Sequence, residues 1–197
     1  GSAYVFVTSD SGATWTQQAK LTASDGATGD KFGYSCGIYQ TSTTDIDIVI
    51  GAYHDDDVAS AYGSAYVFNG NGSSWTQTAK LVHDSPSAAD YFGYSVGIYS
   101  NHIIVGSKWD DAPLYYNQGI AFVFEKSGST WSQLQKLYSS DKSNSDWFGE
   151  SVSISENRLV VGTNGDDDNG SSSGSVYVFE FNGITWTEVK KLLPSDG

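Results

Sequence analysis

Residues 63–68 read Gly-Ser-Ala-Tyr-Val-Phe, and this phrase is the main evidence for the fold because it recurs along the chain. The same six residues open the chain at 1–6. Close variants stand at 119–124 (Gly-Ile-Ala-Phe-Val-Phe) and at 174–179 (Gly-Ser-Val-Tyr-Val-Phe). The copies start 55 to 62 residues apart. A phrase that returns at such intervals indicates a repeat protein in which each unit is one supersecondary structure.

Three further phrases return with the first. A tryptophan phrase that ends in Lys-Leu stands at 14–21, 74–81, 130–137 and 185–192. A phrase that ends in Phe-Gly stands at 30–33, 90–93 and 146–149. An Ile/Leu/Val run that ends in Gly stands at 48–51, 103–106 and 159–162.

Each repeat predicts four short strands. The residues after Phe-Gly alternate between small polar and apolar types, as in 94–98, and the Ile/Val run is apolar throughout, as in a strand buried on both faces. The Tyr-Val-Phe phrase and the tryptophan phrase supply the third and fourth strands. The turns at 100–102 and 156–158 are short enough for β-hairpins.

Four antiparallel strands make one blade of a β-propeller, and a blade buries its faces only against like neighbours. The sequence therefore predicts a single all-β domain over 1–197. Residues 1–29 supply strands three and four of a partial blade plus a linker, and complete blades occupy 30–81, 90–137 and 146–192. Because closed propellers have four to eight blades, we expect a longer natural protein or copies that complete each other.

Composition narrows the partners. Of 197 residues, 23 are acidic and 10 are basic, which gives a formal net charge of −13. Such a surface repels nucleic acid and anionic membranes, and no apolar run approaches the roughly 20 residues that cross a bilayer. The chain starts without Met or a signal peptide, so we expect a mature or excised segment. The single cysteine, Cys36, shares its repeat position with Val96 and Val152, which predicts a small apolar filler.

These phrases resemble the FG-GAP repeat family, whose best-known member is the integrin α-subunit head. The match is closer to bacterial and protist repeats, through Gly-Asp-Asp-Asp-Asn-Gly at 165–170 and Trp-Thr-Gln-Gln-Ala-Lys-Leu at 15–21. The resemblance implies a β-propeller, an extracellular or cell-surface location, and adhesion or ligand binding, often with calcium. Integrin-type calcium loops between strands one and two are not carried over, because two of these turns are too short and 40–47 lacks the Asp-x-Asp-x-Asp-Gly spacing.

Acidic clusters recur instead between strands two and three, and they are the candidate metal ligands. They comprise Asp55, Asp56 and Asp57; Asp110 and Asp111; and Asp166, Asp167 and Asp168 with Asn169. Calcium takes six to eight oxygen ligands, which such loops could supply, most readily the third with its glycine-rich flanks. The alternative is a solvated polar turn.

Other recurrent residues have structural or recognition hypotheses. Asp30, Asp90 and Asp146 stand two residues before Phe-Gly and are expected to accept backbone N–H bonds there. The repeated Trp15, Trp75, Trp131 and Trp186 favour packing over sugar stacking. Aromatic residues in non-repeated loop positions are the candidate ligand contacts: Trp109, Trp147, Tyr115 and Tyr116, with Tyr53 similar. Asn71 and Asn169 begin glycosylation sequons.

The sequence as a whole predicts a non-catalytic, secreted or cell-surface binding or adhesion module, with a protein or glycan ligand or copies of itself as partners. We expect no catalytic residues and no cofactor other than calcium. One alternative is a structural subunit that assembles through blade edges, and another is a lectin-like propeller. A third is a glycan-active enzyme that uses Asp110 and Asp111.

Overall fold

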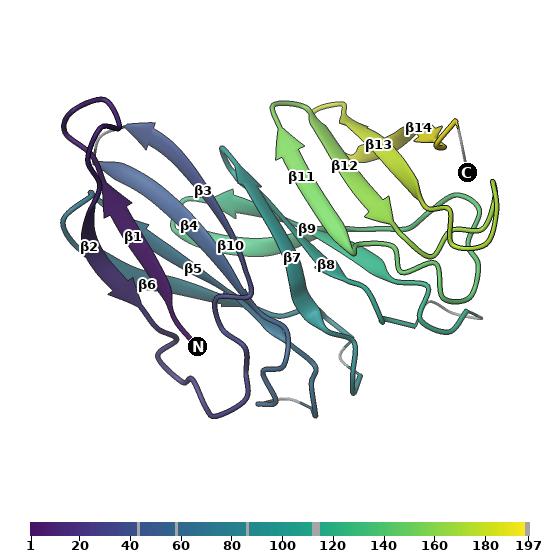
Figure 1. The fold of residues 1–197 in the computed structure, drawn as a ribbon, viewed down its shortest axis with the longest axis horizontal. Helices are drawn as coiled ribbons and strands as arrows, with labels where there is room; N and C mark the ends of the chain where they lie inside the picture. Colours follow the sequence, from purple (N-terminus) through teal and green to yellow (C-terminus); the bar gives the residue numbers. More distant parts are fainter. Residues whose placement is uncertain (43, 58, 86, 112–114, 196–197) are drawn as a thin grey trace.

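A computed structural model describes residues 1–42, 44–57, 59–85, 87–111 and 115–195. The described residues form fourteen strands in four antiparallel sheets and contain no helix, so no helical span of a membrane occurs among them. The predicted all-β fold of four-stranded antiparallel blades is confirmed. The sheets stand side by side as an arc of a propeller and do not close into a ring within this chain (Figure 1).

The strands follow the repeat. A two-stranded sheet holds β1 (Ala3–Val7) and β2 (Thr16–Leu21). The first complete blade holds β3 (Ser35–Ser42), β4 (Asp45–Ala52), β5 (Ser64–Gly70) and β6 (Trp75–Leu81). The middle blade holds β7 (Phe92–Tyr99), β8 (His102–Ser107), β9 (Ile120–Ser127) and β10 (Thr130–Leu137). The last blade holds β11 (Ser151–Ser155), β12 (Arg158–Thr163), β13 (Ser175–Phe181) and β14 (Trp186–Leu192).

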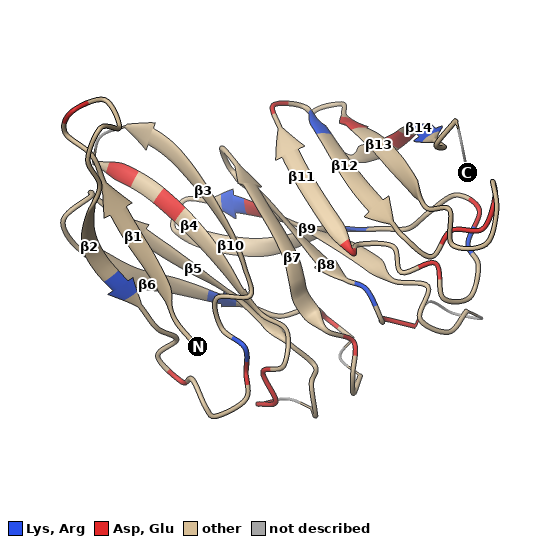
Figure 2. Ribbon diagram, viewed as in Figure 1, with Lys and Arg blue, Asp and Glu red and all other residues tan. Residues whose placement is uncertain are grey.

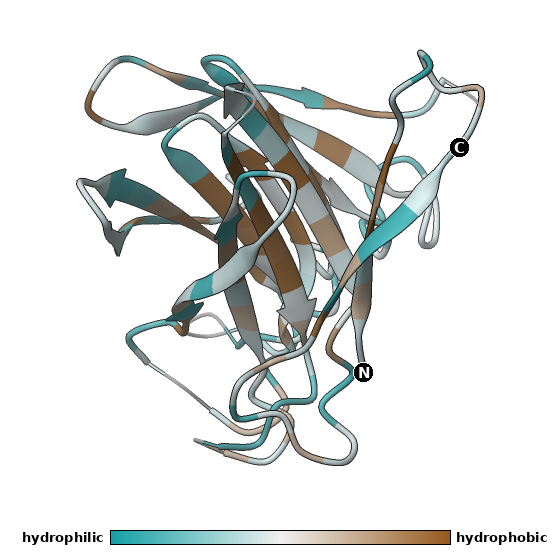
Figure 3. Cartoon of the chain, turned by 90° about the vertical axis from the view of Figure 1, so that its left-hand side faces the viewer, coloured by the Kyte–Doolittle hydropathy of each residue, from teal (hydrophilic) through white to brown (hydrophobic). Residues whose placement is uncertain are grey.

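The hydrophobic core consists of three layers, each between two successive sheets. Val49 and Val67 of the first complete blade share a cluster with Phe92 and Val96 of the middle blade, and the other two clusters repeat this arrangement. Figure 3 shows hydrophobic segments along the strands inside the molecule and hydrophilic residues in the loops. Because each layer needs two sheets, the stability of a blade depends on its neighbour.

The Phe-Gly phrase lies where the backbones of neighbouring blades touch. The Phe92 amide donates to the carbonyl of Tyr62 in the preceding blade (2.9 Å). Gly93 has a φ of 88°, and a Cβ there would lie 2.3 Å from the backbone oxygen of Ser64. A Cβ on Gly63 would likewise lie 2.0 Å from the oxygen of Phe92. Glycine is therefore required at both positions because a side chain would push the blades apart.

The two ends of the arc expose faces that are covered elsewhere. Ile38 is 62 % exposed, whereas its repeat equivalents Ile98 and Ile154 are 7 % and 8 % exposed. Cys36 lies on the same strand and is exposed, so its prediction as a buried filler is wrong. The physical reason is that the two-stranded sheet before β3 has no first and second strands to cover this face.

Candidate functional site

Loops from three blades gather at one end of the strands. The connections between strands two and three lie there, together with the linkers that lead into each Phe-Gly (Figure 1). Figure 2 shows that many acidic residues lie in these loops, at the lower end as drawn. Two arrangements stand out in this region. One is a charged cluster that occurs in two of the blades, and the other is a patch of aromatic rings.

The first clasp, our name for the cluster of Asp25, Asp55, Asp57, Tyr66 and Lys80, is centred on a lysine. The Lys80 ammonium lies 2.8 Å from Asp25, 3.0 Å from Asp55 and 2.6 Å from Asp57, and the Tyr66 hydroxyl donates to Asp55. Burial opposes the charge of Lys80, but hydrogen bonds to the carboxylates outweigh it and raise the pKa above its usual value. The clasp fastens the linker to the loop that follows β4.

The last blade, which is the third complete one, repeats this geometry. Its cluster, which we call the third clasp, consists of Asp141, Asp166, Asp168, Tyr177 and Lys191. The Lys191 ammonium lies 2.6, 2.6 and 2.7 Å from the three carboxylates, and the Tyr177 hydroxyl donates to Asp141 and Asp166. Although burial opposes ionisation of Asp166, the bond from Lys191 lowers its pKa below the usual value. The lysine therefore makes the same three carboxylate contacts in two blades, about 110 residues apart in the chain.

The clasps bear on the calcium hypothesis, because a lysine ammonium lies among the first and third aspartates of both loops. The middle aspartates, Asp56 and Asp167, are exposed, and Asp167 accepts the Ser172 amide. Asn169 donates to the carbonyl of Pro194 (2.7 Å). Carboxylate oxygens of Asp141, Asp166 and Asp168 lie within 4.8 Å of one another, so calcium binding there stays a prediction that requires Lys191 to move.

The middle blade departs from the clasp at two positions. Phe122 stands where the sister blades have Tyr66 and Tyr177, and Ser85 stands where they have Asp25 and Asp141. Its lysine, Lys136, pairs with Asp84 (2.6 Å) and Ser85 (2.7 Å).

Asp110, the equivalent of Asp55 and Asp166, is consequently buried beside Asp90 with neither a tyrosine nor a lysine bond. Burial, assisted by the Asp90 charge, raises the pKa of Asp110 to about 8. Asp111 is exposed and accepts the Asn117 amide, so the predicted pair of Asp110 and Asp111 does not share one site.

The three aspartates before Phe-Gly have the role predicted for them. Asp30 accepts the Ala27 amide (2.6 Å), Asp90 accepts the Ser87 amide (2.6 Å), and Asp146 accepts the Ser143 amide (2.9 Å). Each carboxylate closes a tight turn of the linker, which fixes the direction in which the chain enters strand one.

The aromatic patch, our name for the rings of Tyr34, Tyr53, His54, Tyr91, Tyr94 and Trp109, spans two blades. Tyr91 stacks on Trp109 with ring centres 4.6 Å apart. Tyr53 contacts Tyr34, Tyr94 and Tyr91 at 4.5 to 5.3 Å. Tyr34 is 50 % exposed and Trp109 is 37 % exposed, so the patch is partly open to solvent.

A lysine and a carboxylate border the aromatic patch. The Lys108 ammonium lies 3.7 Å from the ring centre of Tyr94 and 2.9 Å from Glu150 of the last blade. A hydrogen bond between the Tyr34 and Tyr94 hydroxyls raises the pKa of Tyr34. The patch is therefore held by cation–π, edge-to-face and hydroxyl contacts rather than by burial alone.

Of the predicted ligand contacts, the structure places Trp109 and Tyr53 in the patch. Trp147 holds the repeat position of Tyr91, but Gly165 stands where Trp109 would be, and the described residues show no ring paired with Trp147. Tyr115 is half-buried and Tyr116 is 73 % exposed in the next loop. Tyr34, Tyr91 and Tyr94 were not predicted as ligand contacts, although all three directly flank Phe-Gly, and neither was His54.

The structure also shows how far the recurrent tryptophans and the two sequon asparagines are exposed. Trp131 and Trp186 are buried in the core, as a packing role requires, whereas Trp15 in the two-stranded sheet is 62 % exposed. Asn71 and Asn169 are exposed, and the Asn71 side chain accepts the amides of Ser73 and Ser74. Glycosylation at either asparagine stays a prediction.

Stacked four-stranded blades with shared loops at one end define a propeller-type repeat protein. The sequence matches the FG-GAP repeat over residues 15–68, 75–124 and 131–179, and the chain belongs to this family. No curated protein matches it. Propellers of FG-GAP repeats are typically non-catalytic and suggest a binding or adhesion module.

Proposed function

We propose that this chain is a non-catalytic, extracellular binding or adhesion module and that the aromatic patch contacts its ligand. The observation that carries the proposal is the contiguity of the six rings, which come from two blades and are partly exposed at the loop end. Clustered exposed aromatic rings on a soluble protein mark interaction sites. Recognition also concentrates in loops that a rigid scaffold holds.

The chemistry of the patch favours a ligand with both apolar and hydroxyl groups. Ring faces of Trp109 and Tyr34 offer stacking surface, and the tyrosine hydroxyls together with Lys108 offer hydrogen bonds. A glycan ring or an exposed protein side chain presents such a combination. The acidic surroundings disfavour strongly anionic ligands.

The test is a binding screen of the whole chain against immobilised glycans and extracellular proteins. For any ligand found, W109A is expected to weaken binding at least tenfold, because Trp109 supplies a stacking face. The matched control is W15A, since Trp15 is exposed but lies outside the patch, and it should bind as wild type. Equal binding by W109A would contradict the proposal.

An extracellular location is part of the same proposal. FG-GAP repeats are typical of extracellular or cell-surface proteins, and both sequon asparagines are exposed. Expression through a eukaryotic secretory route should give a glycosidase-sensitive mass that N71Q and N169Q reduce. A secreted chain without glycan would contradict the glycosylation but not the binding function.

A second candidate, a structural subunit that assembles with copies of itself, is favoured by the open faces of the end blades. Ile38 at one end and Val176 at the other are 62 % and 38 % exposed, where repeat equivalents are buried by a neighbouring blade. Light scattering should then show concentration-dependent growth that I38D abolishes. A monomer at every concentration would eliminate this candidate.

A further inference from the structure

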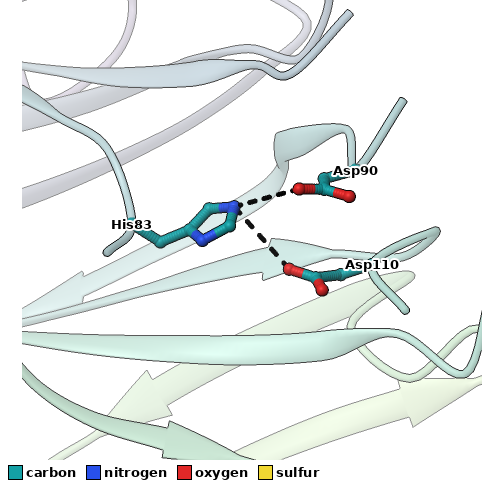
Figure 4. Close-up of side chains that lie close together, drawn as sticks. All are labelled: His83, Asp90 and Asp110. Carbon is teal, nitrogen blue, oxygen red and sulfur yellow. Dashed lines mark ion pairs between the residues drawn. The ribbon is translucent and has the colours of Figure 1, made fainter. Parts of the chain in front are cut away.

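Three titratable side chains converge in the middle blade without belonging to either clasp or to the aromatic patch. His83 follows β6, Asp90 precedes β7 and Asp110 follows β8, and all three point toward one another (Figure 4). Their side chains are 0 %, 3 % and 9 % exposed. The His83 Nε2 lies 3.4 Å from Asp90 Oδ2 and 3.6 Å from Asp110 Oδ2.

The sister blades show that this histidine is special to the middle blade. Ala23 and Ser139 occupy its repeat position, and there Asp55 and Asp166 bond to a tyrosine and a lysine. In the middle blade the tyrosine is replaced by Phe122 and the lysine pairs elsewhere. A histidine therefore stands beside the one aspartate of this repeat position that lacks the clasp.

Hydrogen bonding does not account for the geometry. Both distances from Nε2 exceed the 2.7–3.2 Å of a protein hydrogen bond, so the imidazole makes a good hydrogen bond to neither carboxylate. Among the described residues, His83 Nε2 and Asp110 Oδ2 are buried without any hydrogen-bond partner. Buried polar atoms of native proteins rarely lack a bonding partner, so these two atoms require a common partner that lies between them.

We propose that His83, Asp90 and Asp110 bind a divalent transition-metal ion, with zinc the best fit. Zinc takes imidazole nitrogen and carboxylate oxygen at about 2.0–2.2 Å, and tetrahedral geometry then places ligand atoms about 3.3–3.6 Å apart. The two distances from His83 Nε2 fall in this range, and the ligand atoms of all three residues lie within 4.8 Å of one another. Two carboxylates and one Zn²⁺ also cancel in charge, which removes the repulsion between Asp90 and Asp110. Calcium fits poorly because it prefers oxygen ligands alone.

Of the remaining contacts, that of Asp90 is compatible with this ion, whereas that of His83 must change. Asp90 Oδ2 accepts the Ser87 amide (2.6 Å) and keeps another lone pair for a metal. The Ser85 amide lies 3.4 Å from His83 Nδ1, at the long limit of a hydrogen bond. Metal on Nε2 places the imidazole proton on Nδ1, so this contact must open when the ion binds.

The site would fasten the linker of the middle blade to the loop after β8, as Lys80 and Lys191 do in the sister blades. This inference does not rest on the proposed binding function. The test uses the whole chain, stripped with chelator and free of any affinity tag, titrated with Zn²⁺ in a calorimeter. One equivalent is expected to bind and to raise the melting temperature, because the ion binds only the folded chain.

Variants make the assignment specific. H83A/F122Y rebuilds the residues of the first complete blade at these positions, so it should fold yet lose zinc binding, and D110N should lose it as well. H54A and D168N are matched controls. They change a histidine and an aspartate outside the proposed site, and each variant should still bind one equivalent of zinc. With Co²⁺ in place of zinc, the visible d–d spectrum should indicate tetrahedral coordination by nitrogen and oxygen.

Other outcomes overturn the proposal. Absence of stoichiometric zinc binding would do so, as would binding that H83A/F122Y retains or that H54A abolishes. A Ca²⁺-induced rise in melting temperature that D110N abolishes, without a response to Zn²⁺, would also overturn it. So would a nitrogen NMR spectrum in which zinc leaves the tautomer of His83 unchanged.

Discussion

Tyr177 and Tyr66 each bond to clasp aspartates through a single hydroxyl, whereas Phe122 has none. Y177F should lower the free energy of unfolding by about 1–2 kcal/mol, because buried Asp166 loses a donor while the ring still packs. Urea unfolding of the whole chain measures this change. Y116F is the control, since Tyr116 is 73 % exposed, and an equal loss in both variants would contradict the role of the clasp.

The contribution of Lys191 in the third clasp can be tested in the same way. K191M should lower the free energy of unfolding by about 2 kcal/mol or more, because it leaves three carboxylates facing one another. If calcium can use this loop, the ion should raise the melting temperature of K191M more than that of wild type. The Lys142 ammonium lies over Tyr138 outside the clasp, so K142M serves as the control.

Asp146 makes stability depend on pH. Burial, with help from the charges of Asp166 and Asp141, raises its pKa to about 6 from an ordinary 3.8. The folded chain therefore holds this proton more tightly than the unfolded chain does, and the stability this gives is present below pH 4 and lost as pH rises through 6.

D146N should remove that dependence, because the amide oxygen can still accept the Ser143 amide without a charge to bury. Above pH 7 the variant should be more stable than wild type by about 1 kcal/mol, and the difference should shrink toward pH 4. Thermal melts between pH 4 and 8 measure it. A difference that does not change with pH would show that Asp146 does not titrate in this range.

Among the strand contacts, we expect the one between the Phe-Gly phrase and the preceding blade to be the most sensitive to an added side chain. G93A should destabilise the chain by about 3 kcal/mol, because φ is 88° and the added Cβ meets the Ser64 oxygen. G72A is the control, since Gly72 has a similar φ of 81° but open space around it, and should cost only about 1 kcal/mol. Equal losses would mean that the approach between blades is unimportant.

Repetition explains which elements were predictable. Strands one to four were readable because four phrases recur at fixed positions, and Phe-Gly marked each boundary. The β-bulge that recurs between strands three and four, at Val67/Phe68 and Val178/Phe179, was not readable, because nothing in the local pattern distinguishes an extra residue from a longer strand.

The clasp was not predicted either. The loop aspartates of the clasps were predicted only as metal ligands, because the lysine that pairs with them lies 23 to 25 residues away, in a strand phrase assigned to packing. The aromatic patch was predicted only in part, through Trp109 and Tyr53. Of its other rings, Tyr34, Tyr91 and Tyr94 flank Phe-Gly and His54 lies in the loop after β4, and they come together only when two blades stack.

In the whole molecule, a residue contributes to stability only where a neighbouring blade covers it, so residues at the same repeat position can differ in their contribution. I154A should lower the free energy of unfolding by about 2–4 kcal/mol, because Ile154 is buried between the middle and last blades. I38A, the same change at the same repeat position, should stay within about 0.5 kcal/mol of wild type because Ile38 is exposed. Similar losses in both variants would mean that Ile38 is covered in solution.

The clasps also have a mechanical consequence. Lys80 and Lys191 each tie the last strand of a blade to the linker before its first strand, 55 and 50 residues earlier, so each clasp closes a whole blade into a loop. A chain pulled from its two ends should then lengthen in discrete steps, each releasing one blade of roughly 180 Å of extended backbone. In the middle blade Lys136 bonds to the linker at Asp84 and Ser85 but not to Asp110 in the loop after β8. This blade should therefore yield at the lowest force unless an ion occupies His83, Asp90 and Asp110.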